Sequence, residues 1–335
     1  MTSLNLKSFN TLSVEAVADQ VEIVASEDDI IKLAQDHGST RLLVLGEGSN
    51  VVLAPVVDRV VCLMRSRGIA VDEIGSRIKV TVSAGENWHQ LVMWTLERGY
   101  YGLENLALIP GSAGAAPVQN IGAYGVELAD VLSHVDVVDL ERGGRETFTN
   151  AQCGFGYRDS LFKRTPGRYA ITQLTLDLSK EPGVVAAYPD LQEEFEREGV
   201  IAPTPEQVAA AVTRVRQAKL PDPTLTPNAG SFFKNPVVSN ERASELGRQF
   251  SGLPQYPQAE GKTKLPAAWL IEHCGWKGHR RDGLGVHPEH ALVLVNYGSD
   301  RGDALLELAG EVAASVLDIF DIQLEIEPRI YGRAE

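Results

Sequence analysis

Residues 105–127 read NLALIPGSAGAAPVQNIGAYGVE. The stretch is long, rich in small side chains and nearly without charge, whereas an ordinary surface loop is polar and exposed. A loop of this kind must pack against another surface, and small residues allow its backbone to approach a flat ligand closely. The sequence therefore predicts a ligand-binding loop in the first half of the chain.

Alternating short strands and helices surround this loop in the first 180 residues. Ser26-Glu-Asp-Asp29 forms a capping box, which predicts a helix that ends at Gly38. Asn87 predicts the start of a second helix, which runs to Gly99. Strands are expected at 41–45, 51–53, 60–63, 131–141, 145–149 and 169–178, with 69–74 and 77–83 paired as a hairpin.

The second half of the chain begins near residue 180 and has a different organisation. Residues 204–207, TPEQ, are a strong helix start, and residues 220–227, LPDPTLTP, form a stiff linker that breaks regular structure. Helices are expected at 190–199, 205–218, 239–250, 266–274 and 303–319, and strands at 290–296 and 322–330. The pattern predicts an α+β protein with a domain boundary between residues 180 and 225.

Composition and charge exclude several classes of protein. The chain has 335 residues, 44% hydrophobic and 23% charged, which is the balance of a globular protein with two or three domains. Its net charge of −14 argues against nonspecific nucleic-acid binding, although a local basic pocket can still hold a small anion. Three widely spaced cysteines argue against a disulfide framework. With no signal-peptide core and no apolar run near the ~20 residues of a membrane span, we expect a soluble, cytoplasmic protein.

Several familiar motifs are incomplete. Residues 46–48 start like a dinucleotide fingerprint, but Val51 replaces its third glycine and a strand follows where a helix is needed. Residues 261–263, GKT, end like a phosphate-binding loop, but Tyr256 stands in place of its first glycine. His287-Pro-Glu-His290 has no evident third ligand, so it is better explained as a polar loop and no metal site is expected.

Four other segments have both a structural and a functional explanation. The glycines of 46–50, GEGSN, allow either a tight turn or a nest of backbone N–H groups around a pyrophosphate. Arg158 lies among aromatic residues, where an arginine more often binds a carboxylate or a phosphate. The segment 228–236 is either a buried strand or a strand edge that displays Ser231 to a ligand. The alternation at 324–330 is fully explained by a half-exposed edge strand.

Taken together, these segments resemble the UDP-N-acetylenolpyruvoylglucosamine reductase family, the flavoenzymes of peptidoglycan precursor synthesis. The resemblance extends from about Ser8 to Gly332. Long matches in the same order at so many places are not expected by chance. The most specific matches are 46–50, 84–89 (AGENWH), 102–106 (GLENL), 109–126, 156–160 (GYRDS) and 229–236 (AGSFFKNP).

The family fold implies an FAD-binding domain of two α/β lobes, similar to that of the vanillyl-alcohol oxidase superfamily, and a C-terminal α/β substrate domain. By this resemblance residues 1–180 form the FAD-binding domain, to which a final strand at 322–332 returns. Residues 181–225 would form a substrate-covering loop, helices and linker, and residues 226–320 the substrate domain. FAD is expected to bind tightly and without a covalent bond. The implied FAD contacts are Gly46, Glu47, Gly48, Ser49, Asn50, Pro110, Gly111, Ser112, Ala115, Ala116, Asn120, Gly122, Ala123 and Gly125.

The resemblance also implies a reaction in two halves. NADPH first transfers a hydride to FAD. The enolpyruvyl ether of UDP-N-acetylglucosamine then accepts that hydride from flavin N5 and a proton at the neighbouring carbon, which gives UDP-N-acetylmuramate. Arg158 and Glu327 match the family residues that stabilise the enolate, because hydride addition builds negative charge on the carboxylate. Ser231 matches the proton donor.

Substrate contacts follow from the same resemblance at Tyr188, Lys219, Asn235, Tyr256 and His290. Tyr188 matches a tyrosine on a loop that closes over the diphosphate, which marks the first of the two types of the family. His290 stands where the family has a glutamine, and we expect this position to tolerate substitution. The partner is then a small molecule, not a nucleic acid or a membrane, and the protein is expected to be a monomer.

Two other functions fit part of the sequence. A flavin oxidase of the same superfamily would use oxygen instead of NADPH. Such oxidases often bind flavin covalently, and neither 46–50 nor 109–126 contains a His or Cys for that bond. A non-catalytic sugar-nucleotide-binding protein could share the fold, but it would not need intact Arg158, Ser231 and Glu327.

Overall fold

A computed structural model describes residues 4–332, and these divide into two compact units. Unit 1 contains Leu4, Ala18–Gly48 and Asp58–Ala218. Unit 2 contains Asn5–Val17, Ser49–Val57 and the chain from Lys219 onward. Each unit is therefore assembled from separate stretches of the sequence. The three-part division into an FAD-binding domain, a covering segment and a substrate domain stays a prediction.

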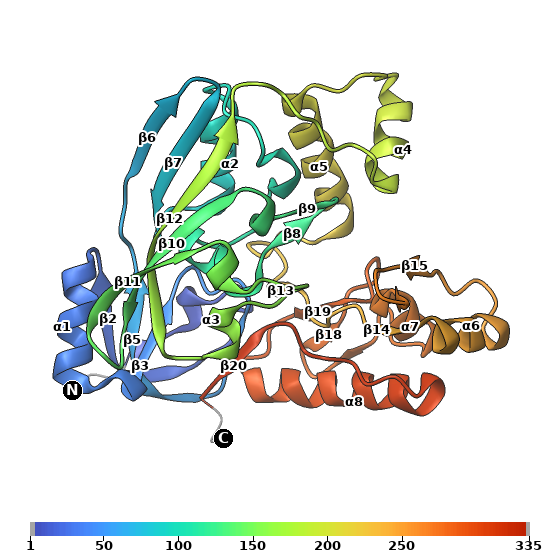
Figure 1. Cartoon of the computed structure of the whole chain (residues 1–335). Coiled ribbons are helices and arrows are strands. Elements are labelled where there is room, and N and C mark those ends of the chain that lie inside the picture. The colour runs from blue at the N-terminus through green and yellow to red at the C-terminus, as the bar shows by residue number, and fades with distance from the viewer. Residues whose placement is uncertain (1–3, 333–335) are drawn as a thin grey trace. The chain divides into compact units, whose positions relative to one another are not determined.

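Two sheets organise unit 1 (Figure 1). The larger one is antiparallel with the strand order β11-β10-β12-β7-β6. Its strands are β6 (Ile69–Ile74), β7 (Arg77–Ser83), β10 (Leu132–Asp139), β11 (Gly144–Thr149) and β12 (Tyr169–Ser179). The smaller sheet has the order β1-β2-β5-β3 and lies mainly in unit 1. Its strands are β1 (Leu4–Asn5), β2 (Val17–Val24), β3 (Leu42–Leu45) and β5 (Val56–Met64).

The helix starts in unit 1 follow their capping residues. Ser26 forms the expected capping box at the start of α1 (Glu27–His37), and Gly38 ends that helix with a φ of +80°. Asn87 caps α2 (Trp88–Leu96) by accepting a hydrogen bond from the Gln90 amide at 2.9 Å. The helix ends at Leu96, so the expected end at Gly99 was wrong. The β6–β7 hairpin is confirmed, with both strands paired along their whole length.

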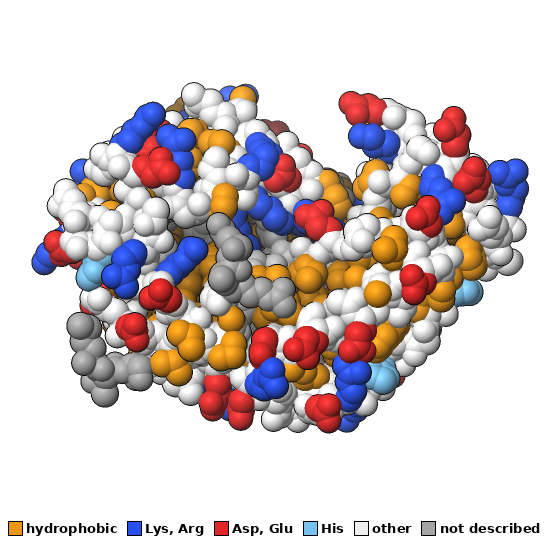
Figure 2. Space-filling model, turned by 90° about the horizontal axis from the view of Figure 1, so that it is seen from below, with side chains coloured by type: hydrophobic (Ala, Val, Ile, Leu, Met, Phe, Trp, Pro, Cys, Tyr) orange, Lys and Arg blue, Asp and Glu red, His pale blue; other side chains and the backbone are white. Residues whose placement is uncertain are grey.

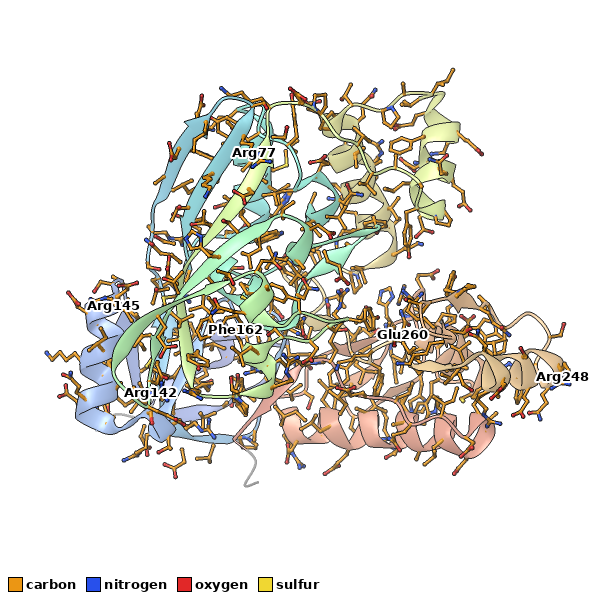
Figure 3. The ribbon with its side chains drawn as sticks, in the orientation of Figure 1. Arg77, Arg142, Arg145, Phe162, Arg248 and Glu260 are labelled. Carbon is orange, nitrogen blue, oxygen red and sulfur yellow. The ribbon has the colours of Figure 1, made fainter. Side chains whose placement is uncertain are left out.

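The interior of unit 1 is apolar and contains two cysteines. Burial raises the pKa of Cys62 and of Cys153 to about 12, so both remain neutral thiols. An aromatic group made of Phe148, Phe162 and Tyr169 packs edge to face, with ring centroids 5.1–6.1 Å apart (Figure 3 labels Phe162). This packing fixes the end of the 155–162 segment inside the unit.

Two longer helices follow β12, namely α4 (Pro189–Glu198) and α5 (Pro205–Lys219), and all of their residues except Lys219 belong to unit 1. Both agree with the sequence prediction to within a residue or two, because each begins at a proline in its first turn. An irregular segment, residues 181–188, joins β12 to α4.

Unit 2 contains a four-stranded antiparallel sheet with the order β13-β19-β18-β17 and a three-stranded sheet with the order β14-β16-β15. Three helices accompany them: α6 (Asn240–Gln249), α7 (Ala267–His273) and α8 (Gly302–Phe320). The strands are β13 (Asn228–Ser231), β14 (Val237–Ser239), β15 (Tyr256–Pro257), β16 (Lys262–Lys264), β17 (Arg280–Arg281), β18 (Leu284–Val286) and β19 (Val293–Asn296).

The last strand is shorter than the sequence predicts. Only β20 (Arg329–Tyr331) is a strand, and it pairs in parallel with β4 (Val51–Leu53) inside unit 2. The expected strand at 324–330 was therefore wrong over most of its length. Pro328 has no backbone N–H to continue a ladder, and residues 325–327 hydrogen-bond instead to residues 232–234.

The surface is mixed in charge. Figure 2 shows acidic and basic side chains interspersed with apolar ones on the face seen from below. Figure 3 labels Arg145, which pairs with Glu27 at 2.7 Å and Asp28 at 2.5 Å. Between residues 4 and 332, no helix has the length and apolar character needed to cross a membrane.

Candidate active site

The loop 105–127 is anchored in unit 1 by the segment 84–89. Trp88 is fully buried, its backbone N–H donates to the Gly111 carbonyl at 2.9 Å, and its indole N–H donates to the Leu106 carbonyl at 3.0 Å. These bonds satisfy backbone groups that would otherwise be buried without partners. The AGENWH segment therefore holds the thin loop in place.

Leu108 occupies a left-handed backbone conformation near the start of this loop, with a φ of +57°. Its N–H donates to His89 Nδ1 at 3.0 Å, and its carbonyl accepts from Arg216 Nε at 3.3 Å. Burial, and then the charge of Arg216, lower the pKa of His89. The imidazole is therefore neutral near pH 7, with Nδ1 as the acceptor. Leucine rarely adopts this conformation, so the two side chains stabilise a strained point of the loop.

The glycine motif at 46–50 touches the same loop. A Cβ on Gly46 would lie 2.2 Å from Ser112 Oγ, so only glycine fits there without a shift. The Gly46 carbonyl accepts from Arg65 at 3.0 Å, and Glu47 accepts from the Asn87 side chain at 2.8 Å. Two separately predicted FAD segments, 46–48 and 111–112, are thus packed against each other inside unit 1.

The other two residues of the motif belong to unit 2. The Ser49 carbonyl accepts from Thr11 Oγ1 at 3.4 Å, and the Asn50 carbonyl accepts from the Arg329 N–H at 3.1 Å. The motif is therefore held at its N-terminal end by unit 1 residues and at its C-terminal end by unit 2 residues.

Arg158 lies at the tip of a tight turn in unit 1. Gly156 and Asp159 close the turn with two backbone hydrogen bonds of 3.0 and 3.2 Å. Arg158 has a φ of +51°, a conformation that costs about 1–2 kcal/mol for a residue with a Cβ. Its guanidinium donates to the Gly122 carbonyl at 2.7 Å, which places the cation against the thin loop. A strained arginine beside a ligand loop is a candidate functional group.

Two polar side chains fix this turn to the loop. Ser160 caps α3 (Leu161–Arg164) and donates to the Val118 carbonyl at 2.6 Å. Asn120 is 1% exposed, and its amide contacts the Glu127 carboxylate at 2.6 Å and the Gly156 carbonyl at 3.3 Å. Asn120 is therefore buried against protein groups, and its side chain has a structural role in addition to any contact with FAD.

Arg216 is a further charged residue that the sequence analysis missed. Burial lowers its pKa, the Tyr124 phenol raises it, and the Arg158 guanidinium lowers it again. Tyr124 itself is half-buried, and this burial raises the pKa of its phenol to about 12. No carboxylate of residues 4–332 forms an ion pair with Arg216, so its charge adds to that of Arg158. Two neighbouring guanidinium groups favour an anionic ligand.

A helical pattern could have identified Arg216. It follows the buried residues Val208 and Val212 of α5 at intervals of four, and such residues share one face of a helix. An arginine on the buried face of a helix is unusual and indicates a partner or a ligand. The sequence was used to predict only a helix at 205–218, with no role for Arg216.

Unit 2 brings together Ser231 and Glu327. Ser231 ends β13, and the next residue, Phe232, accepts a hydrogen bond from the Glu327 N–H at 2.9 Å. An isolated bridge between Phe233 and Ile326 continues the same antiparallel pairing. Both side chains are half-buried. Two of the three predicted catalytic residues are therefore neighbours, although far apart in the sequence.

The predicted substrate residues of unit 2 have different environments. His290 is half-buried, and its Nδ1 is buried without a hydrogen-bond partner among the described residues. Burial, followed by Lys219 and His287, lowers its pKa, so its imidazole is neutral near pH 7. Asn235 accepts from the Ala267 N–H at 2.9 Å at the start of α7, and Tyr256 is 47% exposed. An unpartnered buried nitrogen near a lysine suits a polar ligand.

The predicted residues are thus distributed over both units. Unit 1 holds Arg158, Tyr188 and the FAD candidates up to Gly48 and from Pro110 to Gly125. Unit 2 holds Ser49, Asn50, Lys219, Ser231, Asn235, Tyr256, His290 and Glu327. Lys234, also in unit 2, forms an ion pair with Glu325, which reduces the positive charge that Lys234 can offer to an anionic ligand.

Comparison with known proteins matches two parts of the chain to different families of domains. Residues 17–148 match a family of FAD-binding domains, and residues 222–331 match the C-terminal domain of UDP-N-acetylenolpyruvoylglucosamine reductase. The glycine cradle, the small-residue loop and the neighbouring guanidinium groups of Arg158 and Arg216 fit a bound dinucleotide. The fold and the site therefore define a flavoprotein oxidoreductase.

Whole-chain similarities narrow the class to one family. The chain is 43% identical over 332 residues to a UDP-N-acetylenolpyruvoylglucosamine reductase of Pseudomonas putida, with 98% of both proteins covered. It is 48% identical over 292 residues to that of Chromobacterium violaceum, with 86% of both covered. The crystal structure of the Thermus caldophilus enzyme has 26% identity and a TM-score of 0.67, covering 99% of this chain and 98% of that one. The chain belongs to the UDP-N-acetylenolpyruvoylglucosamine reductase family.

Proposed function

We propose that this protein reduces the enolpyruvyl group of UDP-N-acetylenolpyruvoylglucosamine to give UDP-N-acetylmuramate, with FAD as cofactor and NADPH as hydride donor. The observation that carries the proposal is the pairing of Glu327 with Phe232, directly after Ser231. This pairing brings together the two backbone segments that carry the Ser231 hydroxyl and the Glu327 carboxyl in unit 2. Membership of the reductase family supplies the reaction to which such a pair is suited.

The proposed roles of the residues follow from the charge that the reaction creates. FAD, when bound, supplies the hydride transfer. Addition of a hydride to an enoyl carboxylate builds negative charge on that carboxylate, and a cation already in place lowers the barrier by several kcal/mol. Arg158 is held in a fixed, strained turn, so it needs little reorganisation to act as this cation. Ser231 donates the proton to the neighbouring carbon, and Glu327 completes the site around the developing enolate.

The proposed FAD contacts are the backbone-rich segments 46–50 and 110–125. Their packing against each other, through Gly46 and Ser112, gives a preformed surface with little side-chain bulk. The proposed substrate contacts are Tyr188, Lys219, Asn235, Tyr256 and His290. The neutral His290 next to Lys219 offers one hydrogen bond and one positive charge to a diphosphate. We also propose that the protein acts as a monomer in the cytoplasm, where NADPH and nucleotide sugars are present.

Separate measurement of the two half-reactions tests the proposal. In anaerobic stopped-flow experiments NADPH should bleach the flavin band, and the enolpyruvyl substrate should restore it. Ser231→Ala should slow the second half-reaction by about 100-fold or more and leave the first within about twofold, because only the second needs a proton donor. Ser244→Ala, on the exposed part of α6, is the matched control and should change neither.

Three outcomes would contradict the proposal. Equal slowing of both half-reactions in Ser231→Ala would remove the proton-donor role. A flavin band that NADPH cannot bleach, together with rapid turnover by oxygen, would favour a flavin oxidase. Tight binding of the nucleotide sugar without turnover would favour a non-catalytic binding protein.

A further inference from the structure

The segment 181–188 contains no helix or strand, yet it carries Tyr188, one of the proposed substrate contacts. We infer that Asn105 is a positioning residue that holds this segment against the loop 122–125 and thereby sets the affinity for the nucleotide-sugar substrate. The inference rests on the proposed function, because it assigns a role within the same site. All of the residues concerned belong to unit 1.

The Asn105 side chain spans two chain segments. Asn105 is 2% exposed, and its Nδ2 donates to the Tyr124 carbonyl at 2.9 Å and to the Val185 carbonyl at 2.8 Å. Both amide hydrogens are therefore used, one on the thin loop and one on the segment 181–188. A single amide group bridges the predicted FAD loop and the predicted substrate-covering segment.

Additional contacts hold the segment 181–188 next to the loop 122–125 and to α4. The rings of Tyr124 and Tyr188 meet edge to face with centroids 5.2 Å apart. Gly125 leaves space beside Val185, since a Cβ there would lie 3.5 Å from the valine Cγ1. Gln192 of α4 donates to the Ala186 carbonyl at 2.6 Å. The orientation of Tyr188 thus depends on how residues 185–186 are held.

Asn105 is the buried part of this arrangement. Val185 and Tyr188 are 41% and 43% exposed, so side-chain burial alone holds the segment weakly. Loss of the Asn105 amide would leave two backbone carbonyls without their donor and free the segment to move. The substrate would then have to order the segment on binding, which lowers its apparent affinity. FAD binding and the chemical steps would not need that ordering.

Asn105→Asp tests the inference, because it keeps the size of the side chain and replaces the donor by a carboxylate that faces two carbonyls. Asn150→Asp is a matched control: Asn150 also donates to two backbone carbonyls, those of Ala129 at 2.7 Å and Leu132 at 2.8 Å. Among the described residues, the Asn150 side chain forms no hydrogen bond with residues 181–188 or 122–125. Both variants lose an equivalent pair of bonds, and only one loses the bridge.

The holoenzyme variants should separate in substrate affinity. In Asn105→Asp, we expect about a tenfold increase in KM for the enolpyruvyl substrate and in its Kd for the oxidised enzyme, which corresponds to about 1.4 kcal/mol. FAD content, kcat and the limiting rate of flavin reduction by NADPH should stay within about twofold. In Asn150→Asp, KM and Kd should stay within about twofold of the wild-type values, even if the Tm of this variant falls as much as that of Asn105→Asp.

A pH series gives a readout that a merely structural role would not move. A carboxyl group introduced at this buried place has a raised pKa and becomes an O–H donor as the pH falls. The KM ratio of Asn105→Asp to wild type should therefore decrease between pH 8 and pH 5. If that variant does not fold, Asn105→Ala compared with Asn150→Ala gives the same affinity test.

Two results would overturn the inference. An unchanged KM and Kd in Asn105→Asp, with normal turnover by the wild type, would refute the positioning role and leave the proposed function intact. An equal rise in KM for the Asn150 control would show a general effect of destabilisation instead. Absence of wild-type turnover would refute the proposed function and this inference with it.

Discussion

Gly46→Ala should weaken FAD binding through one steric contact. The new methyl group would lie 2.2 Å from Ser112 Oγ and 3.2 Å from Ser112 Cβ. Gly46 has no positive φ, so the alanine backbone is acceptable and the contact is the whole effect. Ser112 is 4% exposed and cannot simply turn into solvent. The loop must move away, which costs about 1–3 kcal/mol for an overpacked site.

The expected change in FAD affinity follows from that range of free energy. If the cost falls on the FAD-bound state, the Kd for FAD rises by about 5- to 150-fold. Ser112→Ala removes the 2.2 Å contact and leaves only the 3.2 Å one, so the double variant should recover most of the loss. The assay is FAD content by visible absorbance, with Kd from titration of the apoprotein. Additive effects of the two substitutions, with no recovery, would refute the reasoning, because residues in contact must couple.

Three further predictions concern individual side chains. Glu327→Gln should lower kcat by about 100-fold while the protein keeps its FAD band, because the proposed role of the Glu327 carboxyl is at the reacting end of the substrate and not at FAD; a colourless variant would make Glu327 structural. His290→Ala should lower kcat/KM by less than about tenfold, since the imidazole is neutral and supplies one hydrogen bond; a larger loss would contradict this tolerance. The folded-state pKa of His89 is below its ordinary 6.5, so its contribution to stability is present above pH 6.5 and is lost as the pH falls. In His89→Gln, the free energy of unfolding should therefore fall less steeply between pH 7 and pH 5, as measured by urea titration.

Local sequence signals predicted most of the elements of unit 1. The capping residues Ser26 and Asn87 marked two helix starts, and the β6–β7 hairpin followed from its Gly-Ser turn. These features are encoded within a few neighbouring residues. The strand expected at 324–330 failed because the alternation of polar and apolar residues shows which face is buried and not which backbone groups find partners. Pro328 and the pairing with residues 232–234 decided that point.

The residues of the candidate site also include some that the sequence predicted and some that it missed. Resemblance to the family located Arg158, Ser231 and Glu327, and their roles stay predictions. Arg216 was missed because its importance depends on what surrounds it, namely burial next to Tyr124 and Arg158 without a carboxylate. Asn105 lies within the 102–106 match to the family, but its two hydrogen bonds reach Tyr124 and Val185, which only the fold brings close to Asn105. Such long-range contacts leave no local pattern in the sequence.

The pairing of β4 with β20 also has a consequence for synthesis of the protein. β4 leaves the ribosome early, directly after the glycine motif, whereas its partner strand β20 lies far later in the chain. Most of unit 1 lies in one continuous stretch, Asp58–Ala218, and can fold while the rest is still being translated. The Asn50 carbonyl, by contrast, can accept its hydrogen bond from the Arg329 N–H only after residue 329 has been synthesised. A nascent chain would thus have its main sheet long before the Asn50 carbonyl is paired. Loss of β20 would leave the strands of that sheet unchanged and would remove the Arg329 N–H that binds the glycine motif.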